Sequence, residues 1–174
     1  AYANLNNFKT LVICPASLKL MWQNEIKKFT NKKSYIVYAN KIKEAIKKSK
    51  KYNFIIINYE IIGKAIKGGL DFRMFDLAIL DESFAIKNPN SLRSINTNLL
   101  SFIPHKILLT GTPILNRPAE LWSQLHFIEP TMFPNRWKFY FSYCDPVKNH
   151  FGWDFSGASH LEDLRERIKG TVLR

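Results

Sequence analysis

Short apolar runs alternate with helical stretches over most of this chain. The runs expected to form strands are residues 11–14, 35–38, 54–57, 77–81 and 106–110. The stretches expected to form helices are residues 17–29, 41–51, 59–66, 91–102 and 118–128. Strands that alternate with helices build βαβ units, which predicts an α/β fold with a mostly parallel sheet covered on both faces. Right-handed crossovers then place the carboxyl ends of the strands along one edge.

Individual residues support several of these helix starts. Ser17 and Ser91 are placed to cap helices, and Pro118 suits the first position of one. From Thr131 onward the character changes, because the sequence is rich in aromatic residues without a clear period. This part is expected to be an irregular or helical appendage, followed by a helix over residues 161–169.

The balance of charge favours a polyanionic partner. The chain has 174 residues, enough for one well-cored domain, and its hydrophobic fraction of 46% is typical of a globular protein. Its formal net charge is +12, supplied mainly by lysine, which suits non-specific contact with nucleic-acid phosphates. A basic protein without such a partner remains an alternative. The lysine-rich stretch 41–51 fits either a solvated helix face or a patch for the DNA backbone.

The cysteines and the hydropathy pattern exclude other classes. Cys14 and Cys144 lie far apart without metal-ligand spacing, so that we expect no zinc site and two free thiols. No run approaches the roughly 18 apolar residues of a membrane span, and the N-terminus lacks a signal-peptide core. We therefore expect a soluble intracellular protein, nuclear if eukaryotic and cytoplasmic if bacterial or viral. The chain runs almost directly into a strand, which suggests that it was cut from something longer.

Two adjacent carboxylates follow the apolar run 77–80. Asp81 and Glu82 would lie at the carboxyl edge of the sheet, where open α/β sheets bind ligands. That edge would also collect residues 15–17, 58–60 and 110–112. Two such carboxylates require a cation, and a magnesium-bound nucleotide would supply it. The alternative is a strand that ends in a solvated turn.

Four segments in this order resemble a known family. They read LVICPASLKLMWQNEIKKF, FIIINYEII, ILDESFAIKNPNS and ILLTGTPILNRPAELWSQLHFIEP. They resemble the first RecA-like lobe of superfamily-two helicases, in particular the SWI/SNF-type DNA translocases. The later segments FSYC, HFGWDFSGASHLEDL and TVLR look like the annealing-helicase (HepA-related, fork-remodelling) branch. The resemblance implies a three-layer RecA-like lobe over residues 1–130 and a branch-specific aromatic segment with a helix over residues 131–174.

The resemblance also implies roles for individual residues. Asp81 matches the acid that holds Mg²⁺, usually through water, and Glu82 matches the carboxylate that orients or activates the attacking water. The nucleotide would be ATP. The motif that couples the state of the nucleotide to the DNA track corresponds to Thr110, Gly111 and Thr112. Because phosphoryl transfer depends mostly on positioning and on neutralised charge, these residue types suit the chemistry.

A second set of residues would lie along the DNA backbone. The matching positions are Pro15, Ser17, Lys19, Trp22, Lys87, Asn88, Asn116 and Arg117. Contacts of this kind would not depend on base sequence. For Trp22, a place in the hydrophobic core is the simpler alternative to a DNA contact.

Two departures from the family pattern qualify this interpretation. Phe84 stands where the family has a histidine that would link the acidic motif to Thr110, Gly111 and Thr112, and a phenyl ring cannot make that hydrogen bond. No GxxxxGK[ST] loop (Walker A) occurs in the chain. The phosphate cradle is therefore expected upstream of Ala1, and the second RecA-like lobe with its arginine finger beyond Arg174.

Three interpretations of function follow. The first is a fragment of an ATP-dependent DNA translocase or annealing helicase, inactive on its own. The second is a non-catalytic DNA-binding or protein-docking module derived from such a lobe. The third is a related nuclease subunit or RNA helicase, which the segment 151–161 disfavours. The segment 151–154 itself could serve packing or function.

Overall fold

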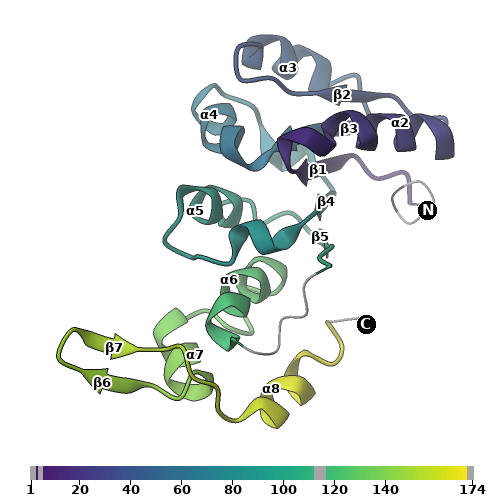
Figure 1. Cartoon of the computed structure of the whole chain (residues 1–174). Coiled ribbons are helices and arrows are strands. Elements are labelled where there is room, and N and C mark those ends of the chain that lie inside the picture. Colours follow the sequence, from purple (N-terminus) through teal and green to yellow (C-terminus); the bar gives the residue numbers. More distant parts are fainter. Residues whose placement is uncertain (1–2, 4–5, 112–116, 172–174) are drawn as a thin grey trace.

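A five-stranded parallel sheet forms the centre of the chain (Figure 1). The computed structural model describes residue 3, residues 6–111 and residues 117–171. The strands are β1 (Thr10–Cys14), β2 (Ser34–Ile36), β3 (Phe54–Asn58), β4 (Leu77–Leu80) and β5 (His105–Leu108). Their order is β2-β3-β1-β4-β5, and every pairing is parallel. The predicted α/β fold with a mostly parallel sheet is confirmed.

Alternation along the strands explains why both faces of the sheet are buried. Leu11, Ile13, Ile55 and Ile57 point into one hydrophobic cluster, whereas Val12 and Ile56 belong to the cluster on the other face. Successive side chains of a strand point to opposite faces, so an uninterrupted apolar run supplies both. The result is three layers, with the sheet in the middle.

Helices cover the two faces unequally. The helix α2 (Lys19–Phe29) packs Ile26 against the face that carries Val12 and Ile56. The opposite face is covered by α3 (Ile42–Ser49) and α4 (Ile62–Lys67), and by Leu100 and Ile103, which follow α5 (Leu92–Asn98). The helix α6 (Pro118–Ile128) follows α5 and adds Phe127 to the same cluster. In Figure 1 these helices form a column beside the sheet.

Short 3-10 turns join several strands to the helices that follow. They are η1 (Ala16–Leu18), η2 (Tyr59–Ile61), η3 (Phe72–Met74) and η4 (Ser83–Ile86). The caps were predicted with mixed success. Ser91 caps α5 by accepting a hydrogen bond from the Ser94 amide, and Pro118 opens α6. The prediction for Ser17 was wrong, because it lies exposed inside η1 and caps no helix.

The C-terminal part contains an element that the sequence did not predict. After α7 (Arg136–Tyr143) come two antiparallel strands, β6 (Val147–Asn149) and β7 (Gly152–Asp154), and then α8 (Leu161–Ile168). The expected irregular or helical appendage is therefore a helix followed by a β-hairpin. The hairpin projects from the body of the molecule (Figure 1). Its strands of three residues are too short for a recognisable alternation of apolar and polar residues.

A third hydrophobic cluster holds this C-terminal part together. It joins Leu121 and Leu125 of α6 to residues of α7 and α8, among them Phe139, Tyr143 and Leu164. The cluster crosses residue 130, so the boundary between the two proposed regions stays a prediction. Among the described helices, none is long and apolar enough to cross a membrane.

Candidate active site at the carboxyl edge of the sheet

Asp81 is fixed by hydrogen bonds from three separate segments. Its carboxylate Oδ2 accepts a hydrogen bond from the Trp22 indole Nε1 at 2.7 Å, and Oδ1 accepts one from the Glu82 amide at 3.0 Å. Its carbonyl oxygen accepts a hydrogen bond from the Tyr59 hydroxyl at 2.8 Å. Its amide donates to Ile13 O at 2.8 Å and so extends the ladder between β1 and β4. The half-buried carboxylate is therefore held in one orientation.

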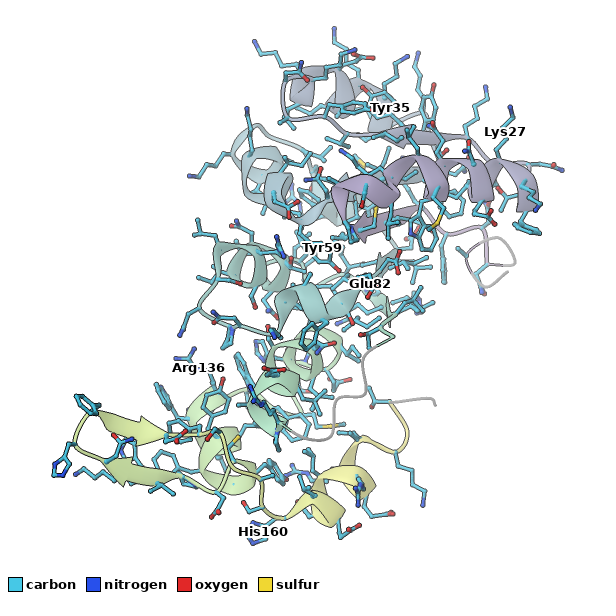
Figure 2. All side chains as sticks on the ribbon, viewed as in Figure 1. Lys27, Tyr35, Tyr59, Glu82, Arg136 and His160 are labelled. Carbon is cyan, nitrogen blue, oxygen red and sulfur yellow. The ribbon has the colours of Figure 1, made fainter. Side chains whose placement is uncertain are left out.

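Glu82 marks a sharp change of chain direction. Its φ of 50° lies in the left-handed region, which a residue other than glycine seldom adopts. The chain leaves β4 at this residue and enters η4, so the Glu82 side chain is exposed where the strands end. Figure 2 shows Glu82 near Tyr59 at the middle of the molecule. The sequence prediction that Asp81 and Glu82 lie at the carboxyl edge is thus matched by the fold.

The acidic pair fits Mg²⁺ that is held mainly by water and phosphate. Within residues 3, 6–111 and 117–171, no group of three or more His, Cys, Asp or Glu side chains could hold a metal ion. Mg²⁺ in nucleotide sites commonly takes one or two carboxylates and completes its shell with waters and phosphates. Both described donors to the Asp81 carboxylate, the Trp22 indole and the Glu82 amide, are neutral, which suits a water-mediated contact with a cation.

The acidic turn is joined to β5 through the backbone. The Ser83 amide donates to Leu109 O at 2.8 Å, and the Leu109 amide donates to Leu80 O at 2.8 Å. Thr110 and Gly111 follow directly after this ladder, so the two motifs meet at one edge. Thr112 lies outside the described residues. The Phe84 ring is half-buried, with Lys87 Nζ 4.0 Å from its centroid.

A buried polar network connects the acidic turn at residues 81–83 to α6. Ser83 Oγ donates to Gln124 Oε1 of α6 at 2.8 Å. Nearby, Ser94 Oγ and Ser123 Oγ lie 2.5 Å apart and connect α5 to α6. These contacts were not predicted from the sequence. Their signal was the pair Ser123 and Gln124 within an otherwise apolar stretch of α6, since buried polar groups need partners.

Lys19 lies in a different setting from the one predicted. It is buried, and its Nζ donates to Asn58 Oδ1 at 3.0 Å and to Val37 O at 3.4 Å. Burial lowers the pKa of the Lys19 ammonium. A contact with a DNA phosphate requires an accessible ammonium, so this placement counts against the role predicted for Lys19. Pro15 and Ser17 lie just before it, half-buried and exposed respectively.

The same network continues from β3 to α5. Asn58 Nδ2 donates to Glu60 Oε2 at 2.6 Å, and Arg93 Nη2 donates to Glu60 Oε1 at 2.7 Å. Burial alone would raise the pKa of the Glu60 carboxyl, but these hydrogen bonds and the Arg93 charge outweigh it and hold that pKa below its usual range. Lys19, Asn58, Glu60 and Arg93 therefore tie together three segments of the carboxyl edge.

The loop residues predicted to contact DNA remain accessible. Lys87 Nζ lies 3.5 Å from Glu120 Oε1, and Arg117 Nη1 lies 4.0 Å from the same atom. Exposed ion pairs of this kind are worth little, so a phosphate could replace Glu120 as the partner of either cation. Asn88 is exposed, whereas Asn116 lies outside the described residues. Their DNA contacts stay predictions.

This geometry defines the class of protein as a RecA-like lobe whose acidic pair stands at the carboxyl edge of a parallel sheet. The sequence matches the family described as SNF2-related domain over residues 3–174. The chain therefore belongs to the SNF2-related domain family, which confirms the resemblance of its motifs.

Individual relatives agree with this assignment. The chain is 32% identical over 168 residues to the Xenopus laevis protein "SWI/SNF-related matrix-associated actin-dependent regulator of chromatin subfamily A-like protein 1", covering 94% of this chain and 17% of that protein. It is 30% identical over 174 residues to the human "DNA annealing helicase and endonuclease ZRANB3", covering 94% of this chain and 16% of that protein. The chain thus spans about a sixth of these relatives.

A solved structure has the same fold. The "Sulfolobus solfataricus SWI2/SNF2 ATPase core in complex with dsDNA" superposes with a TM-score of 0.79 at 26% identity. The match covers 99% of this chain and 35% of that one. Almost every element described above, including those after residue 130, therefore lies within the matched region.

Proposed function

We propose that this chain is the first motor lobe of an ATP-dependent DNA translocase of the annealing-helicase kind. The observation that carries the proposal is the hydrogen bond from Trp22 Nε1 to Asp81 Oδ2. It joins the helix that is expected to follow the DNA backbone to the carboxylate that is expected to hold Mg²⁺. The relatives named as an annealing helicase and an ATPase core bound to double-stranded DNA support both halves.

In this proposal each carboxylate has one task. Bound ATP and Mg²⁺ supply the reactive phosphate and the charge that neutralises it. Asp81 holds the metal through water, in an orientation set by Trp22 and by the Glu82 amide. Glu82, exposed at the turn, orients the attacking water and takes its proton. The left-handed conformation of Glu82 changes the direction of the chain directly after Asp81, between the two carboxylates.

In this proposal, backbone hydrogen bonds couple ATP hydrolysis to movement along DNA. Phe84 cannot make the hydrogen bond expected of a histidine, but Ser83 N and Leu109 O already join the acidic turn to the segment before Thr110. A shift of Glu82 would therefore displace β5 and its loop together. Lys87, held over the Phe84 ring, would follow the same movement.

The phosphate cradle and the second lobe are proposed to lie outside these 174 residues. The sequence holds no glycine-rich GK[ST] loop. Among the described strands, β5 pairs only with β4, and its residues from Lys106 to Leu108 are half-buried. A further strand at this edge would bury them and bring a phosphate loop beside Thr110. The isolated chain is therefore expected to hydrolyse no ATP.

DNA is the proposed partner, and a DNA-binding protein is expected to be located where the DNA is. The net charge of +12, the half-buried Lys87 and the exposed Asn88 and Arg117 support contact with the phosphate backbone. Relatives named as regulators of chromatin support a nuclear location if the source is eukaryotic. In a bacterial or viral source the protein would act in the cytoplasm.

The test is magnesium-dependent ATP turnover by the intact protein, with duplex DNA, RNA or no nucleic acid added. We expect stimulation by duplex DNA above that by RNA. Equal stimulation by RNA would favour the RNA helicase alternative. No turnover in the intact protein, together with DNA binding that weakens steeply with salt, would favour a non-catalytic module, which Phe84 and the missing loop also suggest.

A further inference from the structure

A row of exposed aromatic rings runs from α7 onto the β-hairpin. Trp137 and Phe141 lie four residues apart on α7 and are 52% and 47% exposed. Phe155 joins them, with ring centroids 5.7 Å from Trp137 and 5.4 Å from Phe141. Trp153 of β7 lies 5.0 Å from Phe141 and is 49% exposed. We name these four residues the aromatic row.

The tip of the hairpin extends the row with one free ring. Phe151 is fully exposed, which for a phenyl ring has no benefit in the folded chain itself. The tip nevertheless forms a defined turn, in which the Phe151 amide donates to Asn149 Oδ1 at 2.9 Å and Gly152 adopts a φ of 126° that glycine tolerates. Phe151 is therefore presented on a shaped turn.

Cations accompany these rings. The Arg136 guanidinium lies 4.8 Å from the centroid of the Trp137 ring, and Lys148 is the cross-strand neighbour of Trp153. The carboxylate of Asp154 lies on the other face of the hairpin, because Asp154 pairs with Val147 in the adjacent register position. Aromatic rings interleaved with lysine and arginine are typical of surfaces on which bases stack while phosphates are neutralised.

Arg136 also connects the row to the loop that is proposed to contact the DNA backbone. Its Nη1 donates to Asn90 Oδ1 at 2.6 Å, and Asn90 in turn donates its amide to Asn88 Oδ1 at 3.0 Å. Figure 2 shows Arg136 between the hairpin and the rest of the lobe. A strand that leaves the phosphate contacts at Lys87 and Asn88 would therefore meet the aromatic row next.

We propose that the aromatic row and Phe151 form a binding site for unpaired DNA bases. The proposal rests on the function proposed above and adds a site to it. Duplex DNA offers no free base faces to such rings, whereas an unpaired strand does, and stacking tolerates any base. A protein partner fits less well, because the exposed Lys138 follows Trp137 in α7, the exposed Lys148 pairs with Trp153, and protein interfaces are depleted in lysine.

The experiment measures equilibrium binding by the intact protein, without nucleotide and at one salt concentration. The probes are a fluorescein-labelled oligothymidylate, an abasic backbone of the same length and a blunt duplex of the same length. Phe151→Ala is the main variant, Phe151→Tyr is its conservative partner, and Phe102→Ala, which removes an exposed ring just after α5, is the matched control.

Phe151→Ala should weaken binding of the oligothymidylate by about 5- to 150-fold, the range expected for one stacked base. Phe151→Tyr and Phe102→Ala should bind it like the unmodified protein. All four proteins should bind the abasic backbone equally, and likewise the duplex. Adding Trp153→Ala to Phe151→Ala should weaken oligothymidylate binding further.

Three results would overturn the site. One is unchanged oligothymidylate binding in the double variant, which would leave the row as a surface for a protein partner. The second is a loss of binding to the abasic backbone by Phe151→Ala that equals its loss of binding to the oligothymidylate. The third is an equal loss of binding to the duplex. ATP turnover stimulated by duplex DNA tests the proposed motor function separately. If the intact protein shows no turnover but Phe151→Ala still weakens oligothymidylate binding, the binding site is supported and only the motor function is contradicted.

Discussion

The sheet region (β1–β5 with α2–α5) and the C-terminal region (α6–α8 with the hairpin) are built from different side chains. The sheet region buries Leu, Ile and Val completely on two faces. The C-terminal region packs Phe, Tyr and Trp, several of which remain half exposed. A parallel sheet that is covered on both faces has side chains free for chemistry only at the ends of its strands. A cluster of aromatic rings can pack its own helices together and still leave part of each ring exposed for binding.

The largest expected effect concerns ATP hydrolysis, the reaction proposed for the strand ends of the sheet region. In the intact protein, Glu82→Gln should reduce ATP turnover by about 10²- to 10⁴-fold, because an amide cannot take the proton of the attacking water. ATP should still bind. The measurement is steady-state turnover together with nucleotide binding, and Glu166→Gln on α8 is the matched control that should turn over normally. Near-normal turnover of Glu82→Gln would remove Glu82 from this role.

The next effect separates the buried core of one region from the exposed tip of the other. Ile56→Ala should destabilise the lobe by about 2–5 kcal/mol, because Ile56 is fully buried in β3 and the change leaves a cavity. Phe151→Ala should change the free energy of unfolding by no more than about 0.5 kcal/mol. Urea titrations of both variants test this. A comparable loss for Phe151→Ala would mean that the hairpin tip contributes to folding.

A smaller effect tests how the two regions are joined. Ser83→Ala should cost about 1–3 kcal/mol, because Gln124 Oε1 would lose its donor in a buried site between the acidic turn and α6. In the double variant with Gln124→Leu, the loss should be smaller than the sum of the two single losses. Purely additive losses in the unfolding free energy would show that this contact does not couple the regions.

The smallest effect compares the two buried thiols, one in each region. Burial raises the pKa of Cys14 from 9.0 to about 12 and that of Cys144 from 9.0 to about 11. Because the folded chain holds these protons longer than the unfolded chain, each thiol stabilises the fold fully below pH 9 and loses that contribution as the pH rises towards the folded pKa. Between pH 8 and pH 10 the loss is about 1.4 kcal/mol for each thiol.

Cys14→Ala and Cys144→Ala should each flatten this alkaline loss, whatever their effect at pH 8. The measurement is the free energy of unfolding at pH 8 and at pH 10. An alkaline loss as steep in both variants as in the unmodified chain would argue against buried neutral thiols.

Most of the sheet region could be predicted from the sequence because its signals are local. The apolar runs identified every strand of the sheet, and Asp81 and Glu82 were placed at its edge because they follow one of those runs directly. Ser91 and Pro118 mark helix starts through bonds or restrictions within one turn. Such signals survive without knowledge of the tertiary structure.

The surroundings of the site could not be predicted because they join distant positions. Trp22 donates to a residue 59 positions later, and Lys19 finds Asn58 across 39 positions. A tryptophan at helical spacing looks like a core residue, and a lysine near a DNA motif looks like a phosphate contact, until the partner is known. The hairpin was missed for another reason, since its strands owe their pairing to a turn at His150 and Phe151 and to packing on α7.

The outer edge of β5 has a consequence for how this lobe behaves when it is separated from its neighbours. A sheet edge presents a row of backbone donors and acceptors to any other extended chain, including a second copy of itself. Here the edge is only four residues long, and His105 and Lys106 occupy half of it. The short length of this edge and its polar pair would therefore restrain the self-association of a separated lobe, and a short strand supplied to β5 should improve its solubility further.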